Sequence, residues 1–442
     1  MSTPKLRTLT LGCKVNQYET EYVREGLVGA GYSEAVQDEP ADLCIVNTCT
    51  VTAEGDSKSR QQIRRLARRN PDAKIVVMGC YATRAPEDVA ALPGVSEVVT
   101  DKRELPDLLG RFGVADVPTG ISSFGSRHRA YVKVQDGCLL RCSFCIIPKV
   151  RPHLASRPVE HILDEVKRLT ENGYREIVLT GIHLGHYGIE WNRGRAKQDW
   201  TRLSHLIEQI AELPGDFRIR LSSIEATEVT RELIEVMRRG GDKICPHLHI
   251  SMQSGSDSVL RRMRRRWGAQ RFVDRCQLLK DALDNPAITT DIIVGFPGET
   301  DAEFEATCEV SRQVGFSKIH IFPFSARRGT PAAEMSDQVS PPVKQQRVQA
   351  LAHLETELRD AYFEQLRNRE LRVLVERPLD DDAGSFLGTS CRYAPVVLAA
   401  GEEIVGEDPS AVNPVGDFVD VTAGDVSEGR IIALQQAMLN RC

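Results

Sequence analysis

Long hydrophobic runs are missing from this sequence, and their absence narrows the class of protein. The longest apolar stretches, such as residues 75–79, have the length of a buried strand and are far too short to span a membrane. The N-terminal segment MSTPKLRTLTLGCKV likewise contains no apolar run of signal-peptide length. We therefore expect a cytoplasmic protein that has no membrane partner.

The overall composition is that of a globular protein. Hydrophobic residues make up 41% of the chain and charged residues 27%. A length of 442 residues exceeds that of one ordinary domain, so two or three domains are expected.

The chain contains twelve cysteines, which is a high number for a cytoplasmic protein. Because disulfides are rare in a reducing compartment, clustered cysteines there indicate a metal site or catalysis. Four of them have no spaced partner, and we expect these to be small buried side chains: Cys44, Cys245, Cys276 and Cys308. Cys391 and Cys442 carry no signal either.

The net charge of −5 hides an asymmetry along the chain. Residues 376–429 hold twelve Asp or Glu against two Arg, a local charge of −10, so the rest of the chain is about +5. Two segments are strongly basic, residues 58–69 and 261–271. Such a run is commonly a solvated helix face. Beside a metal centre, however, two of them favour a polyanionic partner such as RNA.

The first hundred residues alternate between strand-like and helical segments. Strands are predicted at 6–11, 43–47 and 75–78, and helices at 16–30 and 57–70. This alternation indicates a parallel sheet with helices on its faces, a Rossmann-like domain that we place at residues 4–110. Several Pro and Gly residues between 101 and 128 then predict an irregular linker.

A second α/β series begins near residue 130. Its strands are predicted at 131–135, 176–180, 218–222, 247–252, 289–294 and 318–322. Six strand–helix units predict a partial (β/α)6 barrel, at residues 125–368, whose site lies at the C-terminal ends of the strands. After a long helix at about 342–368, short β-like runs predict a small β-barrel at 370–436.

The sharpest local signal is CLLRCSFC at residues 138–145, which spaces Cys138, Cys142 and Cys145 as C-x3-C-x2-C. The triplet begins where the strand at 131–135 ends, the position at which α/β folds place their chemistry. Three thiolates at this spacing can hold three irons of a cubane cluster and leave the fourth iron without a protein ligand. Zinc is an alternative, but its nearest further ligand, His153, lies eight residues on and follows a proline.

A second set of cysteines is dispersed along the sequence. Cys13, Cys49 and Cys80 each lie just past the C-terminal end of a predicted strand. In a parallel sheet those ends share one edge, so the three thiols are expected to converge. Gly12 and Gly79 would let the backbone approach a bulky cluster closely. Three unrelated buried thiols are the alternative, and the repeated strand-end position argues against it.

Two clusters with an open iron indicate radical chemistry coupled to the transfer of an atom. An open iron can chelate the amino and carboxylate groups of S-adenosylmethionine, and one electron then cleaves the sulfonium to give a deoxyadenosyl radical. Such a radical is needed only for C–H bonds that acid–base groups cannot deprotonate. A second open iron could carry the inserted atom, for which sulfur is the obvious candidate. A reducing electron donor is the partner that this chemistry requires.

The residues also match a known family. CLLRCSFC resembles the radical S-adenosylmethionine signature, and TLGCKVNQYE, NTCTVT and MGC resemble segments of the methylthiotransferases. Further matches cover nearly the whole chain: LTGIHLGHYG, RLSSIE, HLHISMQSGSD, TTDIIVGFPGET and FPFSARRGTPAAEM. The resemblance implies an N-terminal methylthiotransferase domain, a radical barrel and a C-terminal TRAM β-barrel. TLGCKVNQ and GIHLGHYG are most similar to the branch that modifies C2 of N6-threonylcarbamoyladenosine at position 37, beside the anticodon of tRNA.

The resemblance implies roles for both cysteine sets. Cys138, Cys142 and Cys145 would hold the 4Fe–4S cluster that cleaves S-adenosylmethionine, and the dispersed set would hold an auxiliary 4Fe–4S cluster that supplies sulfur. S-adenosylmethionine would be both methyl donor and radical source, with no catalytic residue beyond the cluster ligands. Residues at strand ends would line the cosubstrate pocket, with ordinary turn chemistry as the alternative: Phe144, Gly181, Ser223, Glu225, Gln253, Asp291 and Gly295.

Two features depart from the family pattern. Relatives commonly carry an Arg-Gly pair after the triplet, whereas here Arg151 precedes Pro152, which fixes φ and removes an N–H. The acid-rich C-terminal stretch would repel phosphates, so the main tRNA contact is not expected there. The two basic segments are the RNA-binding candidates, including an indole that could stack on a base: Arg60, Arg64, Arg68, Arg264, Arg265 and Trp267.

Other functions remain open at this point. The same enzyme class could act on isopentenyladenosine at position 37 of tRNA, or on a ribosomal protein. A non-enzymatic RNA-binding protein with structural or redox-sensing iron–sulfur clusters is the third alternative. A cysteine triplet that leaves one iron open, beside strand-end glycines, serves no structural purpose, and this argues against the non-enzymatic alternative.

Overall fold

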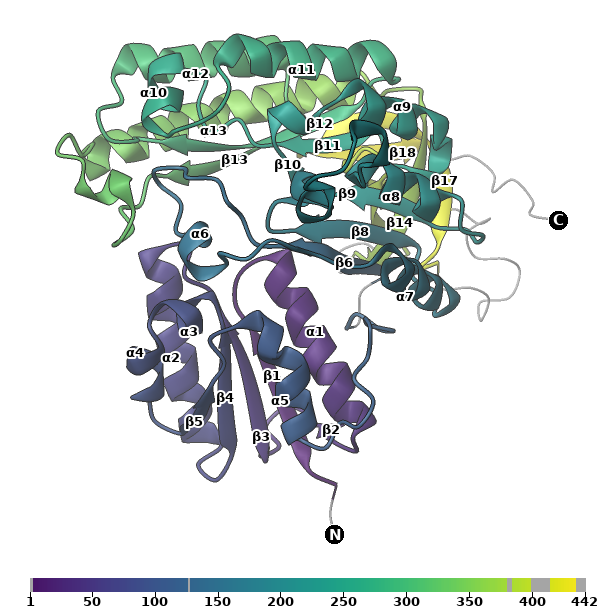
Figure 1. Cartoon of the computed structure of the whole chain (residues 1–442). Helices are drawn as coiled ribbons and strands as arrows, with labels where there is room; N and C mark the ends of the chain where they lie inside the picture. Colours follow the sequence, from purple (N-terminus) through teal and green to yellow (C-terminus); the bar gives the residue numbers. More distant parts are fainter. Residues whose placement is uncertain (1–2, 126–127, 380–383, 399–413, 435–442) are drawn as a thin grey trace.

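Three sheet-based units follow one another in the computed structural model, which describes residues 3–125, 128–379, 384–398 and 414–434 (Figure 1). The first is a five-stranded parallel sheet, the second consists of two four-stranded sheets, and the third is a closed five-stranded β-barrel. The predicted α/β class, partial barrel and small C-terminal barrel are therefore confirmed. No helix in the described part of the chain has the length and apolar character needed to cross a membrane.

The N-terminal unit is a parallel sheet in the order β2-β1-β3-β4-β5. Its strands are β1 (Lys5–Thr10), β2 (Ser33–Glu34), β3 (Leu43–Thr48), β4 (Lys74–Gly79) and β5 (Val95–Val98). Helices α1 (Lys14–Gly29), α2 (Ala53–Arg69), α3 (Cys80–Arg84) and α4 (Pro86–Ala90) cover it (Figure 1). The central strands β3 and β4 are almost entirely buried, as strands covered on both faces must be. The C-terminal ends of β1, β3 and β4 lie at one edge, which faces the middle unit (Figure 1).

The segment after this sheet is more regular than expected. A 3-10 turn at Lys102–Glu104 leads into α5 (Leu105–Arg111), whose leucines are buried in the core of the N-terminal unit. Pro106 lies in the first turn of α5, where its missing N–H removes no helical hydrogen bond and its fixed φ suits a helix. The linker prediction was therefore wrong for its first part, because a proline there starts a helix. Residues 126–127 lie outside the described residues.

The middle unit is an open barrel built from two four-stranded sheets, in which seven strands are parallel and one short strand is antiparallel. One sheet has the order β7-β6-β8-β9 and the other β10-β11-β12-β13, and a bridge between Ile219 and Ile244 joins them. The strands are β6 (Arg129–Asp136), β7 (Ala155–Ser156), β8 (Glu176–Gly181), β9 (Arg218–Leu221), β10 (Ser223–Ile224), β11 (His247–Ile250), β12 (Ala287–Val294) and β13 (Lys318–Pro323). The helices are α6 (Ile147–Val150), α7 (Val159–Glu171), α8 (Leu203–Ala211), α9 (Arg231–Arg239), α10 (Asp257–Arg262), α11 (Ala269–Ala282), α12 (Asp301–Val314) and α13 (Pro341–Glu364).

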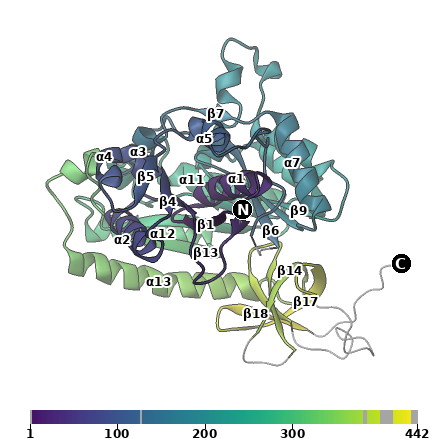
Figure 2. The same cartoon turned by 90° about the horizontal axis from the view of Figure 1, so that it is seen from below.

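The C-terminal unit is a barrel of β14 (Glu370–Pro378), β15 (Phe386–Ser390), β16 (Pro395–Leu398), β17 (Phe418–Ser427) and β18 (Arg430–Leu434). It lies at the end of α13 and to one side of the N-terminal unit (Figure 2). Of the acid-rich stretch at 376–429, residues 380–383 and 399–413 lie outside the described residues.

Buried charges join the C-terminal barrel to the middle unit. Glu176 accepts from Arg218 Nε at 2.7 Å and from Arg220 Nε at 2.9 Å, and all three side chains are almost fully buried. Arg218 also donates to two carbonyls of the C-terminal barrel, those of Arg372 at 2.7 Å and Thr389 at 2.8 Å. The carboxylate thus fixes a guanidinium whose remaining donors reach across the interface.

Replacement of Arg218 by alanine is expected to loosen the C-terminal barrel. Removing one member of a buried ion pair costs about 3–5 kcal/mol, because its partners stay buried and unpaired. Hydrogen–deuterium exchange should therefore rise in β14 and β15. The matched control is Arg238→Ala, which removes an exposed arginine paired with Glu235 and should leave that exchange unchanged. Equal exchange in the two variants would contradict the role of Arg218.

Candidate active site

The dispersed cysteines converge at the C-terminal edge of the N-terminal sheet. Cys13 precedes α1, Cys49 follows β3, and Cys80 begins α3 after β4. The Asn16 amide donates to the carbonyls of Leu11 at 2.8 Å and Thr48 at 3.0 Å, which ties together the ends of β1 and β3. One short hydrogen-bonded network therefore positions the turns that carry Cys13 and Cys49.

Two glycines let these turns pack closely. Gly12 has φ +106°, and a Cβ placed there would lie 2.9 Å from Cys49 Cβ and 3.2 Å from Cys49 Sγ. Gly79 has φ +100°, and a Cβ there would lie 2.3 Å from the Thr48 backbone. Burial raises the pKa of the Cys49 thiol, and the nearby thiols of Cys80 and Cys13 raise it further. The three cysteines therefore lie at the ends of neighbouring strands along one edge of the sheet.

The compact triplet lies in the loop between β6 and α6. Cys138 N donates to the Arg151 carbonyl at 3.2 Å, and Ser143 Oγ donates to the Arg262 carbonyl at 2.7 Å. These bonds fix the loop to the segment after α6 and to α10. Burial raises the pKa of the Cys145 thiol to about 12, and the neighbouring thiols Cys142 and Cys138 contribute to the rise. Free thiols in such a site hold their protons, so ligand binding by these sulfurs requires a metal to displace them.

Two buried cations donate to sulfurs of the compact triplet. Arg265 Nη1 lies 3.5 Å from Cys142 Sγ, and His183 Nδ1 lies 3.6 Å from Cys138 Sγ. Arg265 also donates to Glu225, and His183 Nε2 contacts Glu228. The two carboxylates bracket one turn at Ala226–Glu228, in which Glu225 and Glu228 form a capping box. A single turn therefore orients both donors toward the ligands, as partners of metal ligands commonly do.

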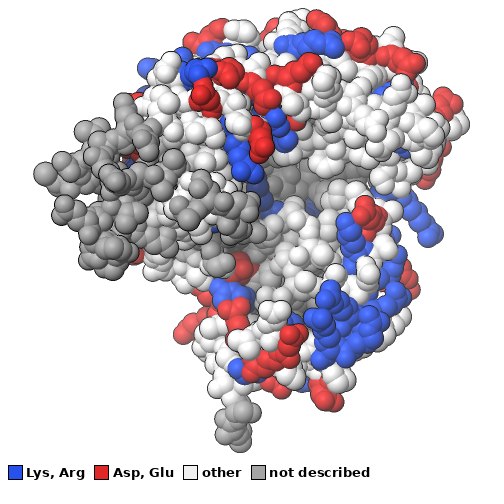
Figure 3. All heavy atoms as spheres, turned by 180° about the vertical axis from the view of Figure 1, so that it is seen from behind, with Lys and Arg blue, Asp and Glu red and all other residues white. Residues whose placement is uncertain are grey.

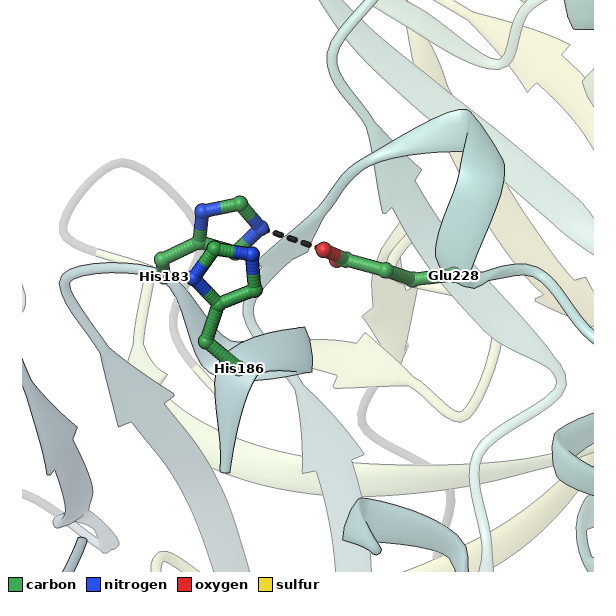
Figure 4. Close-up of side chains that lie close together, drawn as sticks. All are labelled: His183, His186 and Glu228. Carbon is green, nitrogen blue, oxygen red and sulfur yellow. Dashed lines mark hydrogen bonds and ion pairs between the residues drawn. The ribbon is translucent and has the colours of Figure 1, made fainter. Parts of the chain in front are cut away.

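His183, His186 and Glu228 bring their ligand atoms within 4.8 Å of one another (Figure 4). The two rings are stacked at 3.5 Å with an interplanar angle of 11°. An ion bound at about 2.0–2.1 Å from one nitrogen of each stacked ring would lie well out of both ring planes. The lone pair of an imidazole nitrogen lies in the ring plane, so neither ring could coordinate such an ion. Burial would lower the pKa of His183, but hydrogen bonds with Cys138 and Glu228 raise it to about 9. The stacked geometry therefore does not suit a single ion held by both rings, and His183 lies between Cys138 and Glu228.

The spacing of the cysteines also distinguishes between metals. Among the described residues, that histidine–glutamate trio is the one set of three such ligand atoms found within 4.8 Å of one another, so in each cysteine triplet at least one pair of sulfurs lies farther apart than this. A single zinc ion with bonds of about 2.3 Å would bring its sulfurs to about 3.8 Å of one another. The wider spacing fits a polynuclear iron–sulfur cluster.

A cavity of about 170 Å³ opens beside the compact triplet. Its lining includes the three cysteines and four of the residues expected at the cosubstrate pocket: Phe144, Ser223, Glu225 and Gln253. Gln253 has φ +69°, a left-handed conformation that costs a non-glycine residue free energy and is often found at ligand sites. The position of this cavity beside open-iron ligands suits a cosubstrate that binds to the cluster.

Three other expected pocket residues lie away from the cavity lining. Gly181 packs against Gln135. Asp291 contacts His249 Nε2 at 3.2 Å. Gly295 lies against Lys344, and its N–H donates to Glu299 at 2.6 Å. In the structure these residues form strand ends and a turn. This agrees with ordinary turn chemistry, the alternative to a role in the cosubstrate pocket.

The RNA-binding candidates divide into exposed and buried residues. Arg64, Arg68 and Arg264 are exposed, and Arg60 is half-buried with its guanidinium donating to Tyr81 Oη at 3.1 Å. Trp267 is only 5% exposed, and its Nε1 donates to Glu225 at 3.2 Å, so its ring offers no face to a base. Arg265 is buried against Cys142 and Glu225. The prediction that Trp267 and Arg265 contact RNA is therefore corrected, because their neighbours in the fold cover them.

Gly12→Ala is expected to prevent assembly at Cys13, Cys49 and Cys80 alone. The added Cβ would force Cys49 to move, and φ +106° is strained for alanine. After reconstitution the variant should bind about half the iron of the parent, because one of two four-iron clusters is lost. Gly29→Ala is the control, since no atom lies within 4 Å of a Cβ added there. Full iron content in Gly12→Ala would contradict the site.

Comparison with known proteins adds an independent identification. Residues 132–310 match the family described as Radical SAM superfamily, and residues 5–101 match one described as Uncharacterized protein family UPF0004. The chain is 42% identical over 417 residues to threonylcarbamoyladenosine tRNA methylthiotransferase MtaB of Bacillus subtilis, covering 90% of this chain and 91% of the relative. It is 36% identical to the protein of that name from Thermotoga maritima, with 98% of each chain covered.

A solved structure shares the fold. The radical S-adenosylmethionine methyltransferase TsrM from Kitasatospora setae, with cobalamin and a [4Fe-4S] cluster bound, aligns with a TM-score of 0.54 at 13% identity, covering 75% of this chain and 77% of that chain. At this identity the match concerns the arrangement of the elements alone. The sequence relatives, by contrast, match along nearly their whole length. The chain belongs to the radical S-adenosylmethionine tRNA methylthiotransferase family.

Proposed function

We propose that this enzyme adds a methylthio group to C2 of N6-threonylcarbamoyladenosine at position 37, in the anticodon loop of tRNA. The observation that carries the proposal is the pair of cysteine triplets, one at the edge of the N-terminal sheet and one at the mouth of the barrel. The nucleoside itself rests on the names of the relatives at 36–42% identity.

Each triplet has a separate role. Members of the family require S-adenosylmethionine and two 4Fe–4S clusters, of which one supplies the electron that cleaves the cosubstrate and the other supplies sulfur. Cys138, Cys142 and Cys145 hold the first, beside the cavity that takes S-adenosylmethionine. Cys13, Cys49 and Cys80 hold the second. An external one-electron donor completes the set of partners.

The protein's own residues orient these groups. Arg265 and His183 lie within hydrogen-bond distance of two sulfurs of the compact triplet, and these contacts fix the orientation of the ligand side chains. Ser223, Gln253 and Glu225 line the cosubstrate cavity together with the three cysteines of the loop. Glu225 accepts from Arg265 and from Trp267 Nε1, which fixes its carboxylate at the edge of the cavity.

The target base reaches this site from a single-stranded loop. A loop base can be extruded at small free-energy cost, which suits chemistry on its C2 edge inside a barrel mouth. Exposed arginines flank the compact triplet: Arg141, Arg264 and Arg266. They provide positive charge next to the entrance, where the phosphates that flank an inserted base would lie.

A second basic surface lies on α2. Its exposed arginines are Arg64, Arg65, Arg68 and Arg69, and the view from behind shows Lys and Arg gathered on the N-terminal unit where α2 lies (Figure 3). A face of this charge, on the unit that holds the auxiliary triplet, supports contact with the tRNA backbone beyond the modified loop.

Cysteine variants should distinguish the roles of the two triplets. Cys80→Ala is expected to retain reductive cleavage of S-adenosylmethionine to deoxyadenosine while forming no methylthiolated product. Cys138→Ala should lose both. In a deletion strain, mass spectrometry of tRNA nucleosides should show loss of only the methylthio derivative of threonylcarbamoyladenosine, restored by the parent gene and not by Cys80→Ala.

Each contrary result has a definite reading. Cleavage by Cys138→Ala would overturn the assignment of the radical cluster. Loss of the isopentenyl-linked methylthio nucleoside instead would show the other tRNA substrate, and an intact tRNA profile would indicate a protein substrate. Cys44→Ala, in β3 and distant in role from either triplet, is the control and should behave as the parent.

Charge reversal on α2 tests the RNA surface. Arg64→Glu combined with Arg68→Glu should weaken tRNA binding and reduce the slope of log K against log salt by about 2, since each phosphate contact contributes about 1. Binding of S-adenosylmethionine should not change. Arg238→Glu, on the exposed face of α9, is the control. An unchanged salt slope in the double variant would remove α2 from the tRNA-binding surface.

A further inference from the structure

Arg151 contacts ligands of both cysteine triplets. Its Nε donates to Cys80 Sγ at 3.4 Å, and its carbonyl accepts from Cys138 N at 3.2 Å. The side chain is 1% exposed and follows α6 of the middle unit, so it crosses from the barrel to the edge of the N-terminal sheet. Any displacement of this residue therefore moves a ligand of each triplet.

The rest of the Arg151 guanidinium is fixed by the N-terminal helix. Nη1 and Nη2 donate to the two carboxylate oxygens of Glu19 at 2.7 and 2.8 Å, and Nη2 donates to Asn16 Oδ1 at 3.1 Å. Nη1 also donates to Asp136 at 2.9 Å. Asn16 is the residue that ties together the ends of β1 and β3. Arg151 is thus bound to the same network that positions Cys13 and Cys49.

The buried charged side chains around Arg151 sum to a positive charge. Lys133 joins the network through Glu19 at 2.8 Å, and Lys102 donates to the carbonyl of Gly79 at 3.1 Å. These two lysines and Arg151 face two carboxylates, Glu19 and Asp136. Burial would raise the pKa of Glu19, but Arg151 and Lys133 hold it well below its usual range. Three cations against two carboxylates leave one positive charge beside the Cys80 sulfur.

A second arginine crosses between the same two units. Arg327, in the segment after β13, is 4% exposed, and its Nη2 donates to Asp56 Oδ2 at 2.6 Å and to Thr50 Oγ1. Asp56 is in the first turn of α2 and also accepts from Arg84 at 2.6 Å and from Thr50 at 2.6 Å. Thr50 follows Cys49 in sequence. Arg327 therefore fixes the Cys49 turn from the barrel side without touching a sulfur.

We propose that Arg151 and Arg327 are positioning residues that set the separation of the two triplets, and that Arg151 also tunes the auxiliary cluster through its N–H contact with Cys80. The proposal rests on the proposed function, because the separation matters only if a radical generated at one triplet acts on a substrate served by the other. Both arginines come from the barrel, and each is joined to the turn of a different auxiliary cysteine. The pair therefore holds the auxiliary edge at two points, which prevents rotation as well as translation.

The two arginines differ in what they should affect. An N–H donor and positive charge at a ligand sulfur stabilise the reduced cluster, so their loss makes the reduction potential more negative. Arg151 supplies both to Cys80, whereas Arg327 supplies neither to any sulfur. Loss of either should misplace substrate relative to the two triplets, since misplacement of reacting groups by small distances lowers the rate.

The experiment compares Arg151→Gln, Arg327→Gln and a matched control in the reconstituted full-length enzyme. The control is Arg347→Gln, whose side chain is similarly buried and donates to Glu299 at 2.8 Å within the middle unit. Iron content and circular dichroism establish that each variant is folded and loaded. Potentiometric titration followed by electron paramagnetic resonance then gives the potential of each cluster. Product analysis gives the ratio of deoxyadenosine to methylthiolated tRNA.

We expect Arg151→Gln to shift the auxiliary potential to more negative values and leave the other cluster unchanged. Both Arg151→Gln and Arg327→Gln should raise the ratio of deoxyadenosine to product about tenfold, as loss of supporting residues commonly does. Arg327→Gln and Arg347→Gln should keep both potentials, and Arg347→Gln should keep the ratio. If Arg151→Gln does not load, Arg151→Lys retains the charge while losing the forked contacts, and the same potential shift, smaller in size, is expected.

Two results would overturn the proposal. One is an unchanged auxiliary potential in a loaded Arg151 variant, and the other is a deoxyadenosine ratio no higher than that of Arg347→Gln. Neither result bears on the proposed function, which stands or falls with the methylthiolated nucleoside formed by the parent enzyme. If the parent enzyme failed to form that nucleoside, the proposed function would be rejected. The cluster reduction potentials would then test only the effect of Arg151 on the auxiliary cluster.

Discussion

Sulfur ligands buried between two units must be given positive partners, and this requirement organises the centre of the molecule. Arg151 reaches Cys80, Arg265 reaches Cys142, and His183 reaches Cys138. Each cation is in turn bound by a carboxylate, respectively Glu19, Glu225 and Glu228. A buried thiolate or a buried cation alone would be costly, whereas a hydrogen-bonded chain of alternating charge is tolerated in a low-dielectric interior. The order of carboxylate, cation and sulfur is therefore repeated at both triplets.

The two units meet this requirement in different ways. In the N-terminal sheet, parallel strand ends bring three turns to one edge, and glycines at 12 and 79 remove the side chains that would keep those turns apart. In the barrel, one loop carries all three cysteines, and the side chains that contact their sulfurs come from the segments after β8 and after α10, both held by the turn between Glu225 and Glu228. The dispersed site depends on the whole sheet, so one added methyl group can disrupt it. The compact site depends mainly on its own loop.

The C-terminal barrel contributes to stability more than to chemistry in this arrangement. Glu176, Arg218 and Arg220 attach it to the start of β8 and β9, away from the strand ends that carry the cavity. The two groups of exposed arginines on α2 and at the barrel mouth instead lie on the units that hold the sulfur ligands. Positive charge thus accompanies the triplets, which agrees with a polyanionic substrate approaching from that side.

The sequence alone determined both cysteine sets and the order of the three units. Spacing identified Cys138, Cys142 and Cys145, and the rule that parallel strands end at one edge identified Cys13, Cys49 and Cys80. Only the tertiary structure decided what the arginines and the tryptophan do. Within the run at 261–271, Arg264 is exposed whereas Arg265 and Trp267 are covered by the turn that carries Glu225. A cysteine at a strand end has its position fixed by local pattern and topology, but a long side chain takes its role from whichever distant element packs against it. Arg151 likewise pairs with Glu19 at a sequence separation of 132 residues and Arg327 with Asp56 at one of 271 residues, which no local pattern encodes.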